Sequence, residues 1–284
     1  MRKKSPQMPV DAKIYSGDCR KILPCIPNDS VNLVYCDPPF GIGKDRTYVR
    51  LKTDTDPTGD RTGFGAKRYR TKEVSTQSYA DAFEDYSKFI RPRLKSLYRV
   101  LAPNGSLFLH VDYRNSHHCR LILDEIFGPE NFKNEIIWAW DYGAKPKNRW
   151  PAKHNNIFWY TKNPKNYTFN RDAIDRIPYM APSLVGEKKA KLGKVPTSCW
   201  WGTIVPTNGK ERTGYPTQKP LWLLKRIVSV HSNKGDTVLD AFAGSGTTGE
   251  AAGMLGRNFI LMDSNPIAVT LAAKRLKRFK PTLV

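Results

Sequence analysis

The sequence predicts an α/β fold built on a mostly parallel sheet with helices on both faces. Short apolar runs typical of buried strands alternate with segments whose apolar residues recur at helical spacing. Acidic residues follow or end several of these runs, at Asp18, Asp37, Asp240 and Asp263. Ligands bind beyond the carboxyl ends of parallel strands, so four carboxylates there indicate a site. The 284 residues suit one large domain with an insertion, or two small domains.

The first elements lead to a proline-rich strand end. Residues 13–15 predict a short strand that runs into Gly17-Asp18, and residues 19–26 predict one or two helical turns. Val31–Cys36 is a compact apolar run, which is typical of a buried strand. Pro38-Pro39 ends this strand, so Asp37 is expected at its carboxyl end.

A long segment without periodicity comes next. Residues 41–78 are rich in Gly, Thr, Asp, Lys and Arg, and we expect a mobile functional loop. Apolar positions at helical spacing predict a helix over Tyr79–Val100, ended by Pro103-Asn-Gly105. A strand over Ser106–Val111 and a helix over residues 116–127 follow.

The second half begins with two strands, Asn134–Trp140 and Asn156–Tyr160, which suit an antiparallel pair at the sheet edge. Residues 163–214 are rich in Lys, Pro, Asn and Gly and indicate an inserted segment of irregular structure. The remaining expected elements alternate helix and strand: Leu221–Ser232, Asp236–Asp240, Gly246–Leu255, Asn258–Met262 and a last helix from Pro266.

The charge balance indicates a polyanionic partner. Lys and Arg number 47 against 26 Asp and Glu, a formal net charge of +21, which exceeds what solubility requires. No apolar run is long enough for a membrane span, and no apolar stretch behind Met1 indicates a secretory signal. Five scattered cysteines without ligand spacing favour reduced thiols in the cytosol over a metal site.

A glycine motif near the carboxyl terminus would also suit a nicotinamide dinucleotide cofactor. Residues 244–249 match G-x-G-x-x-G, and Asp263 ends the next strand, where a ribose carboxylate belongs. A dinucleotide fold needs a second half after this unit, whereas here the other strands precede it. The motif therefore favours another adenosine cofactor over hydride chemistry.

Five motifs in one order resemble the β class of DNA amino-methyltransferases, which use S-adenosylmethionine: Gly17-Asp18, Asp37–Phe40, Pro216–Pro220, Asp240–Thr248 and Asp263. The resemblance implies a circularly permuted, Rossmann-like methyltransferase fold with a seven-stranded, mostly parallel sheet. It also implies three regions: a catalytic half over 1–162 that contains the mobile loop 41–78, a target-recognition insert over 163–214, and a cofactor-binding half over 215–284.

The resemblance assigns catalysis to Asp37, Pro38, Pro39 and Phe40. The Asp37 carboxylate and the Pro38 carbonyl would accept the two hydrogens of an amino group and free the nitrogen lone pair for methylation. Phe40 would stack on a base flipped out of the duplex. Aspartate in the motif favours the N6 position of adenine. N4 of cytosine and an inactive DNA-binding relative stay as alternatives.

The resemblance also places S-adenosylmethionine at the glycine turn. Asp18 would contact the adenine edge, Asp263 the ribose, and Lys219 the methionine carboxylate. The full set of expected cofactor ligands is Asp18, Thr217, Lys219, Asp240, Phe242, Gly244, Ser245, Gly246, Thr247 and Asp263.

Double-stranded DNA is the expected substrate, and basic residues on two segments are expected to bind it: Lys44, Arg46, Arg68, Arg70, Lys145, Lys147 and Arg149. We expect the loop 41–78 to close over the DNA. Trp200-Trp201 suits either a base-facing role or core packing. A homodimer and a cognate restriction endonuclease are further partners that the resemblance raises, and the expected location is cytoplasmic, with the nucleoid.

Overall fold

The computed structural model describes residues 10–41, 46–59, 61–62, 67–79, 83, 85–143, 145–206 and 209–284. The chain divides into two compact units. The first unit comprises residues 1–40 and 85–284, and the second comprises residues 41–84. The structure thus separates the segment after Phe40 from the rest, and it keeps the expected insert, 163–214, within the first unit.

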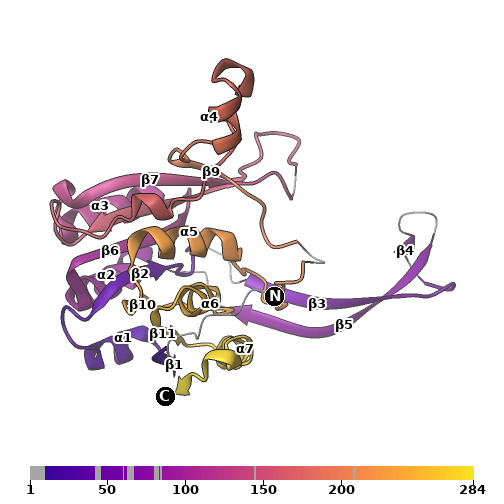
Figure 1. Ribbon diagram of the computed structural model, residues 1–284. Coiled ribbons are helices and arrows are strands. Elements are labelled where there is room, and N and C mark those ends of the chain that lie inside the picture. Colours follow the sequence, from indigo (N-terminus) through magenta and orange to yellow (C-terminus); the bar gives the residue numbers. More distant parts are fainter. Residues whose placement is uncertain are drawn as a thin grey trace, which may run out of the picture. The chain divides into compact units, whose positions relative to one another are not determined.

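A nine-stranded sheet forms the centre of the first unit (Figure 1). Its order is β12 (Thr282–Leu283), β1 (Ala12–Ser16), β11 (Asn258–Asp263), β10 (Thr237–Asp240), β2 (Val31–Cys36), β6 (Leu101–Asp112), β8 (His154–Thr161), β7 (Phe132–Ala139) and β9 (Cys199–Trp201). All neighbours are parallel except those of β8, which pairs antiparallel with β6 and β7. The seven expected strands are present, and the short β12 and β9 extend the sheet at its edges.

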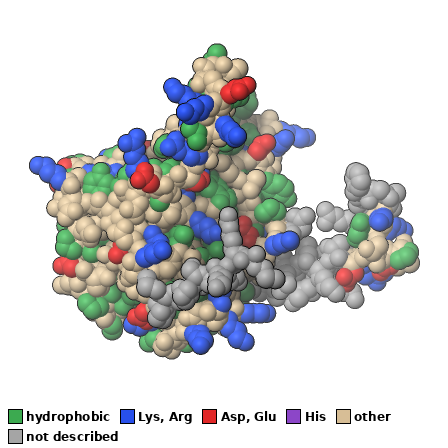
Figure 2. Space-filling model, viewed as in Figure 1, with side chains coloured by type: hydrophobic (Ala, Val, Ile, Leu, Met, Phe, Trp, Pro, Cys, Tyr) green, Lys and Arg blue, Asp and Glu red, His purple; other side chains and the backbone are tan. Residues whose placement is uncertain are grey.

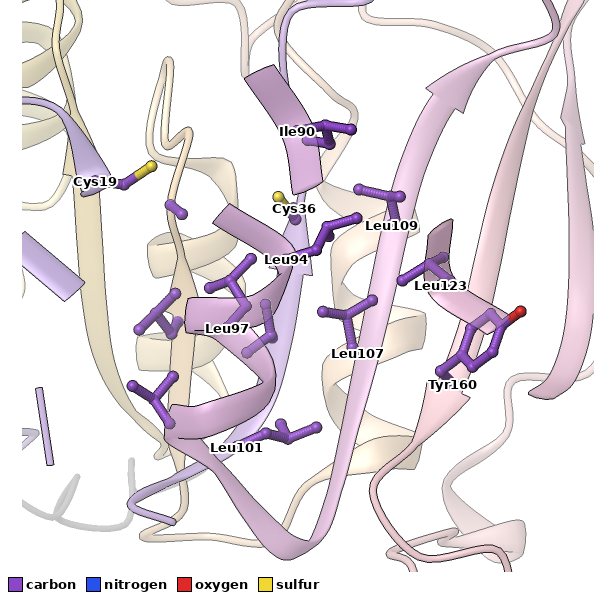
Figure 3. Close-up of a cluster of buried hydrophobic side chains, with 14 of the residues drawn as sticks. Cys19, Cys36, Ile90, Leu94, Leu97, Leu101, Leu107, Leu109, Leu123 and Tyr160 are labelled. Carbon is purple, nitrogen blue, oxygen red and sulfur yellow. The ribbon is translucent and has the colours of Figure 1, made fainter. Parts of the chain in front are cut away.

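Helices cover both faces of this sheet. One face carries α1 (Cys19–Ile22), α2 (Tyr86–Val100) and α3 (Ser116–Phe127), and the other carries α5 (Leu221–His231), α6 (Thr247–Met254) and α7 (Pro266–Arg275). Short 3₁₀ turns lie at Leu23–Cys25, Pro129–Asn131 and Lys277–Phe279. In the first core, Leu94 and Leu97 of α2 pack in one cluster with Cys36, Leu107 and Leu109 of the sheet (Figure 3).

Helix α2 is shorter than the sequence pattern predicts. It begins at Tyr86 because the Asp85 side chain caps it, accepting hydrogen bonds from the N–H groups of Ser87 and Lys88. It ends at Val100, and β6 starts at Leu101 and includes the Pro103–Gly105 stretch that was expected to end the helix. Apolar spacing alone placed the start of the helix too early, at Tyr79, whereas the predicted end at Val100 agrees with the structure.

The second unit contains an antiparallel sheet, so the expectation of a loop without regular structure is wrong for its described part. β3 (Arg46–Thr55) pairs with β5 (Arg68–Tyr79), and β4 (Arg61–Thr62) extends β5 on its other side. Figure 1 shows β3 and β5 as two long strands side by side. Thr, Val and Tyr recur along both strands and favour extended backbone, although the polar composition and the missing periodicity predicted a loop.

The segment 163–214 contains little regular structure, as expected, but it packs on the main sheet. Its elements are 3₁₀ turns at Arg171–Ala173 and Pro182–Leu184, helix α4 (Glu187–Leu192) and strand β9, which pairs with β7. Trp200 in β9 is buried beneath the Arg226 guanidinium of α5, 4.8 Å from its ring centre, whereas Trp201 is 74% exposed. Core packing therefore accounts for Trp200.

Candidate active site

Four parallel neighbours bring the predicted acidic residues to one edge of the sheet. β1, β11, β10 and β2 run in one direction, and Asp18, Asp263, Asp240 and Asp37 stand at or just beyond their carboxyl ends. Asp240 lies opposite Tyr35, two residues before Asp37. The convergence expected from the sequence is therefore present in the fold.

Asp240 is buried at the end of β10, only 2% exposed. Its Oδ1 accepts the backbone N–H of Phe242 at 3.0 Å, and its Oδ2 accepts the Thr248 hydroxyl at 2.5 Å. Burial raises the pKa of Asp240 to about 7; the two hydrogen bonds oppose this, and the nearby charges of Asp37 and Asp263 add to it. The carboxylate joins the strand end to the first turn of α6.

The turn after β10 requires glycine at two positions. Gly244 has φ +50° and Gly246 has φ +74°, both in the left-handed region. Between and after them, Ser245 and Thr247 are buried. Arg275 of α7 donates to the Ser245 carbonyl and hydroxyl, each at 3.2 Å, and to the Thr247 hydroxyl at 2.8 Å. The side chains of these two expected cofactor ligands thus support the turn itself.

Asp263 is tied to the same turn. Its Oδ2 accepts the Gly244 N–H and its Oδ1 accepts the Asn265 N–H, each at 2.8 Å. Burial raises the pKa of Asp263, and these two hydrogen bonds oppose the rise. Each carboxylate oxygen keeps a second lone pair, so the geometry suits ribose hydroxyl groups.

Asp18 has a structural partner that the sequence did not indicate. Its Oδ1 caps α1 by accepting the Arg20 N–H at 2.9 Å, and both carboxylate oxygens accept from Arg93 of α2, at 3.0 and 2.9 Å. Arg93 is buried and lies 3.9 Å over the Phe89 ring. Burial acts to raise the pKa of Asp18, but the hydrogen bonds and the Arg93 charge outweigh it and lower this pKa below its ordinary value.

Asp37 follows β2 with its two carboxylate oxygens in different environments. Lys219 donates to Oδ2, whereas Oδ1 is buried and has no hydrogen-bond partner among the described residues. Burial raises the pKa of Asp37, and the Lys219 charge and hydrogen bond oppose the rise. Pro38 and Pro39 have no N–H to offer. The sequence-based role of Lys219, at a methionine carboxylate, did not foresee this ion pair, which joins residues 182 positions apart.

Phe40 lies beside this ion pair. The Asn115 side chain, beyond the end of β6, donates to the Phe40 carbonyl at 2.6 Å and positions the backbone. The Lys219 Nζ is 5.4 Å from the centre of the Phe40 ring. The ring is half-buried, so part of it is open to a ligand.

A buried histidine supports Phe40, and sequence reasoning missed it. His110 of β6 has its ring centre 6.1 Å from that of Phe40; Tyr35 Oη lies 2.7 Å from His110 Nδ1, and Asn155 Nδ2 lies 2.9 Å from His110 Nε2. Burial, aided by the Lys219 charge, lowers the pKa of His110 well below its usual range, so the ring is neutral. The available signal was a histidine within an apolar strand run.

A pocket of about 500 Å³ opens next to the ion pair. Four aromatic side chains, the Asn155 amide and the segment that carries Lys219 contribute to its walls. The lining residues are Trp138, Trp140, Tyr142, Asn155, Thr203–Pro206, Arg212 and Tyr215–Lys219. Aromatic walls with few polar groups are typical of a site for a flat heteroaromatic ring.

A model of the N6/N4 DNA methylase family matches residues 31–274, a range that includes both Asp37–Phe40 and the glycine turn. The chain belongs to this family. The family uses S-adenosylmethionine as its cofactor. Among the residues that the structure describes, no group of three His, Cys, Asp or Glu could hold a metal ion.

Curated relatives of this methylase match along most of its length. It is 29% identical to the type II methyltransferase M.HpaI of Haemophilus parainfluenzae, over 94% of this chain and 74% of that one. It is 31% identical to the DNA adenine methyltransferase YhdJ of Escherichia coli K12, over 93% and 82% respectively. It is 32% identical to M.BglII of Bacillus subtilis, of which it spans 64%.

Solved structures confirm the fold of the methylase. The M1.HpyAVI–SAM complex matches with a TM-score of 0.60 at 23% identity, over 93% of this chain and 98% of that one. The cytosine-N4-specific PvuII DNA methyltransferase matches with a TM-score of 0.64 at 18% identity, over 98% and 93% respectively.

Three of the residues expected to bind DNA lie in a loop at the edge of the sheet where Asp37 lies. Asp112, at the carboxyl end of β6, pairs with Asn155 near the start of β8, so the loop 140–153 begins and ends at the edge where Asp37 lies. The residues of this loop that are expected to bind DNA are all exposed: Lys145, Lys147 and Arg149. Trp150 beside them is 94% exposed. Figure 2 shows further Lys and Arg side chains around the protruding α4.

The other expected ligands belong to the second unit. Arg68 and Arg70 are exposed on β5, and Arg70 pairs with Asp56 at 2.7 Å. Lys44 and the Arg46 side chain lie outside the described residues. In the described ranges, no helix is both long and apolar enough to cross a membrane.

Proposed function

We propose that this methylase transfers the methyl group of S-adenosylmethionine to the N6 amino group of an adenine flipped out of duplex DNA. The observation that carries the proposal is the Asp37 carboxylate at the end of β2: Lys219 holds one oxygen, and the other is buried and has no hydrogen-bond partner in the part of the chain that the structure describes. A buried acceptor without a donor is costly, so the site favours a ligand that brings an N–H group.

The residues at the sheet edge suit the cofactor. Asp37, Asp240 and Asp263 are three largely buried carboxylates, and Lys219 is the cation paired with one of them. When bound, S-adenosylmethionine supplies an electrophilic methyl on a sulfonium cation, which an excess of negative charge stabilises. Asp263 would hold the ribose, and the glycine turn brings the backbone close to the ligand.

The protein prepares the amino group of the base. Asp37 Oδ1 and the Pro38 carbonyl accept its two hydrogens, which draws the nitrogen towards tetrahedral geometry and frees its lone pair. Phe40 stacks on the base, and its carbonyl is fixed by Asn115 at 2.6 Å. The aromatic pocket beside Lys219 gives the extruded base a place to enter, which offsets part of the few kcal/mol that flipping costs.

Two observations support adenine as the target. The motif begins with Asp37, and the relative YhdJ is named a DNA adenine methyltransferase. N4 of cytosine is the second candidate, since the PvuII enzyme shares the fold. The type II names of M.HpaI and M.BglII support a restriction–modification setting, for which we propose a cognate endonuclease. The proposed location is the cytoplasm, with the nucleoid. A homodimer is a further proposal, which light scattering would test.

The test is methylation of unmodified genomic DNA with radiolabelled S-adenosylmethionine, followed by nucleoside analysis. Wild type should produce N6-methyladenine, and Asp37→Ala should reduce the rate at least about 100-fold, because it removes the acceptor of the amino hydrogen. Cofactor affinity should change much less, since Asp240 and Asp263 remain at the sheet edge. N4-methylcytosine would establish the alternative. No product from wild type would favour the inactive relative, and full activity of Asp37→Ala would refute the mechanism.

A further inference from the structure

Lys219 occupies a position from which it contacts both halves of the site. Its backbone carbonyl accepts the Thr247 hydroxyl of the glycine turn at 3.1 Å, and its Nζ contacts the Asp37 carboxylate and the Thr217 carbonyl, the latter at 3.3 Å. The side chain is 11% exposed. One residue thus links the cofactor turn to the catalytic carboxylate.

The neighbouring Gln218 makes this position rigid. Its side chain is buried; Oε1 accepts the N–H and hydroxyl of Thr213, each at 2.8 Å, and Nε2 donates to the Glu211 carbonyl at 2.7 Å. Pro220, which follows Lys219, precedes the first residue of α5. Lys219 is therefore presented to Asp37 by a braced segment.

The groups that face Asp37 do not favour its anionic form without Lys219. Burial raises the pKa of Tyr35 and Cys36 from β2 well above their ordinary values, so both are uncharged, and His110 from β6 is neutral. Asp240 from β10 is a buried carboxyl group and brings no positive charge. Burial itself raises the pKa of Asp37. Among the described residues, Lys219 is the one cation within ion-pair distance of this carboxylate.

We propose that Lys219 is a positioning residue for methyl transfer: it keeps Asp37 ionised, holds its Oδ2, and so leaves Oδ1 free to accept the amino hydrogen of the base. This inference rests on the proposed function, and it differs from a role at the methionine carboxylate. A neutral Asp37 would carry a proton where the substrate must donate one, and it would not stabilise the positive charge that develops on the nitrogen.

The test measures the ionisation of Asp37 directly. Aspartate labelled with ¹³C at the carboxyl group is titrated by NMR, with Asp37→Asn identifying the signal. An opposite charge at this distance lowers an aspartate pKa by about 1–3 units, so Lys219→Met should raise that of Asp37 by about this amount. Lys219→Arg should stay near wild type, and Lys234→Met, an exposed lysine at the other end of β10, should have no effect.

Activity and cofactor binding provide the second readout. The acid limb of the kcat profile of Lys219→Met should move up with the Asp37 titration, so that raising the pH recovers activity, while the Kd for S-adenosylmethionine changes less than about threefold. An unchanged Asp37 titration would overturn the proposal. A loss of activity that is equal at every pH, with cofactor binding weakened more than about tenfold, would assign Lys219 to the methionine end.

A folding defect of Lys219→Met and an inactive wild type would each have a distinct meaning. If Lys219→Met does not fold, recovery of folding by Asp37→Asn/Lys219→Met would show that the unpaired carboxylate caused the failure and would support the ion pair; continued failure would make Lys219 structural and refute the proposal. If wild type methylates nothing but the NMR shift is present, the proposed function fails while the counter-ion role of Lys219 stands.

Discussion

Substitution of Asp240 by Asn should remove a large part of the pH dependence of folding. Asp240 is buried, and its oxygens accept from the Phe242 N–H and the Thr248 hydroxyl. Asparagine has the same shape: its oxygen can accept from Phe242, and its amide can donate to the Thr248 hydroxyl, which also accepts. The variant thus keeps the contacts and loses the titrating group.

The sign and size follow from the two pKa values of Asp240. The value in the folded protein, about 7, is above the ordinary 3.8, so the folded state binds the proton more tightly than the unfolded state. The free energy of unfolding therefore falls as the pH rises from about 4 to about 7, and this contribution is level above that. Each unit of difference between the two pKa values is worth about 1.4 kcal/mol. Between about pH 5 and pH 8 the free energy of unfolding of wild type should therefore fall by about 2–3 kcal/mol relative to that of Asp240→Asn.

The assay is urea unfolding followed by tryptophan fluorescence across this pH range for wild type and Asp240→Asn. Asp141→Asn, at an exposed aspartate, is the matched control and should follow wild type. The reasoning is refuted if the stability difference between wild type and Asp240→Asn is the same at pH 5 and pH 8. S-adenosylmethionine should stabilise wild type more at high pH, because its cation favours ionised carboxylates.

Three further predictions concern packing and DNA binding. Leu97→Ala, in the fully buried cluster beneath α2, should lower the free energy of unfolding by about 2–5 kcal/mol in urea titrations. Gly246→Ala places a Cβ 3.0 Å from that of Ala272, at a residue with φ +74°, so it should lower the free energy of unfolding by about 1–3 kcal/mol in the same titrations. An unchanged urea midpoint would show that the turn is not constrained. Lys67→Ala with Arg68→Ala, at exposed positions of the second unit, should reduce the slope of log K for DNA against log salt by about 2 while leaving cofactor affinity unchanged, and an identical slope would exclude these side chains from the DNA contact.

The strand–helix pattern of the main unit could be predicted from local sequence. Val31–Cys36 was expected as a strand and is β2, and residues 116–127 were expected as a helix and form α3. Prolines and glycines mark the ends of such segments, and hydrophobic periodicity reports their buried face, so both signals lie within a few residues. The local pattern did not predict the start of α2, which the Asp85 cap sets, or the strands β3 and β5, which pair with each other.

The sequence by itself determined the motif order, and with it the family, the sheet edge where the acidic residues meet, and the expected cofactor. Only the tertiary structure decided how those residues are paired: Asp18 with Arg93, Asp37 with Lys219, and His110 with Tyr35 and Asn155. Backbone periodicity is a property of neighbouring residues, whereas an ion pair or buried hydrogen bond depends on side chains that folding brings together from 75 or 182 positions away.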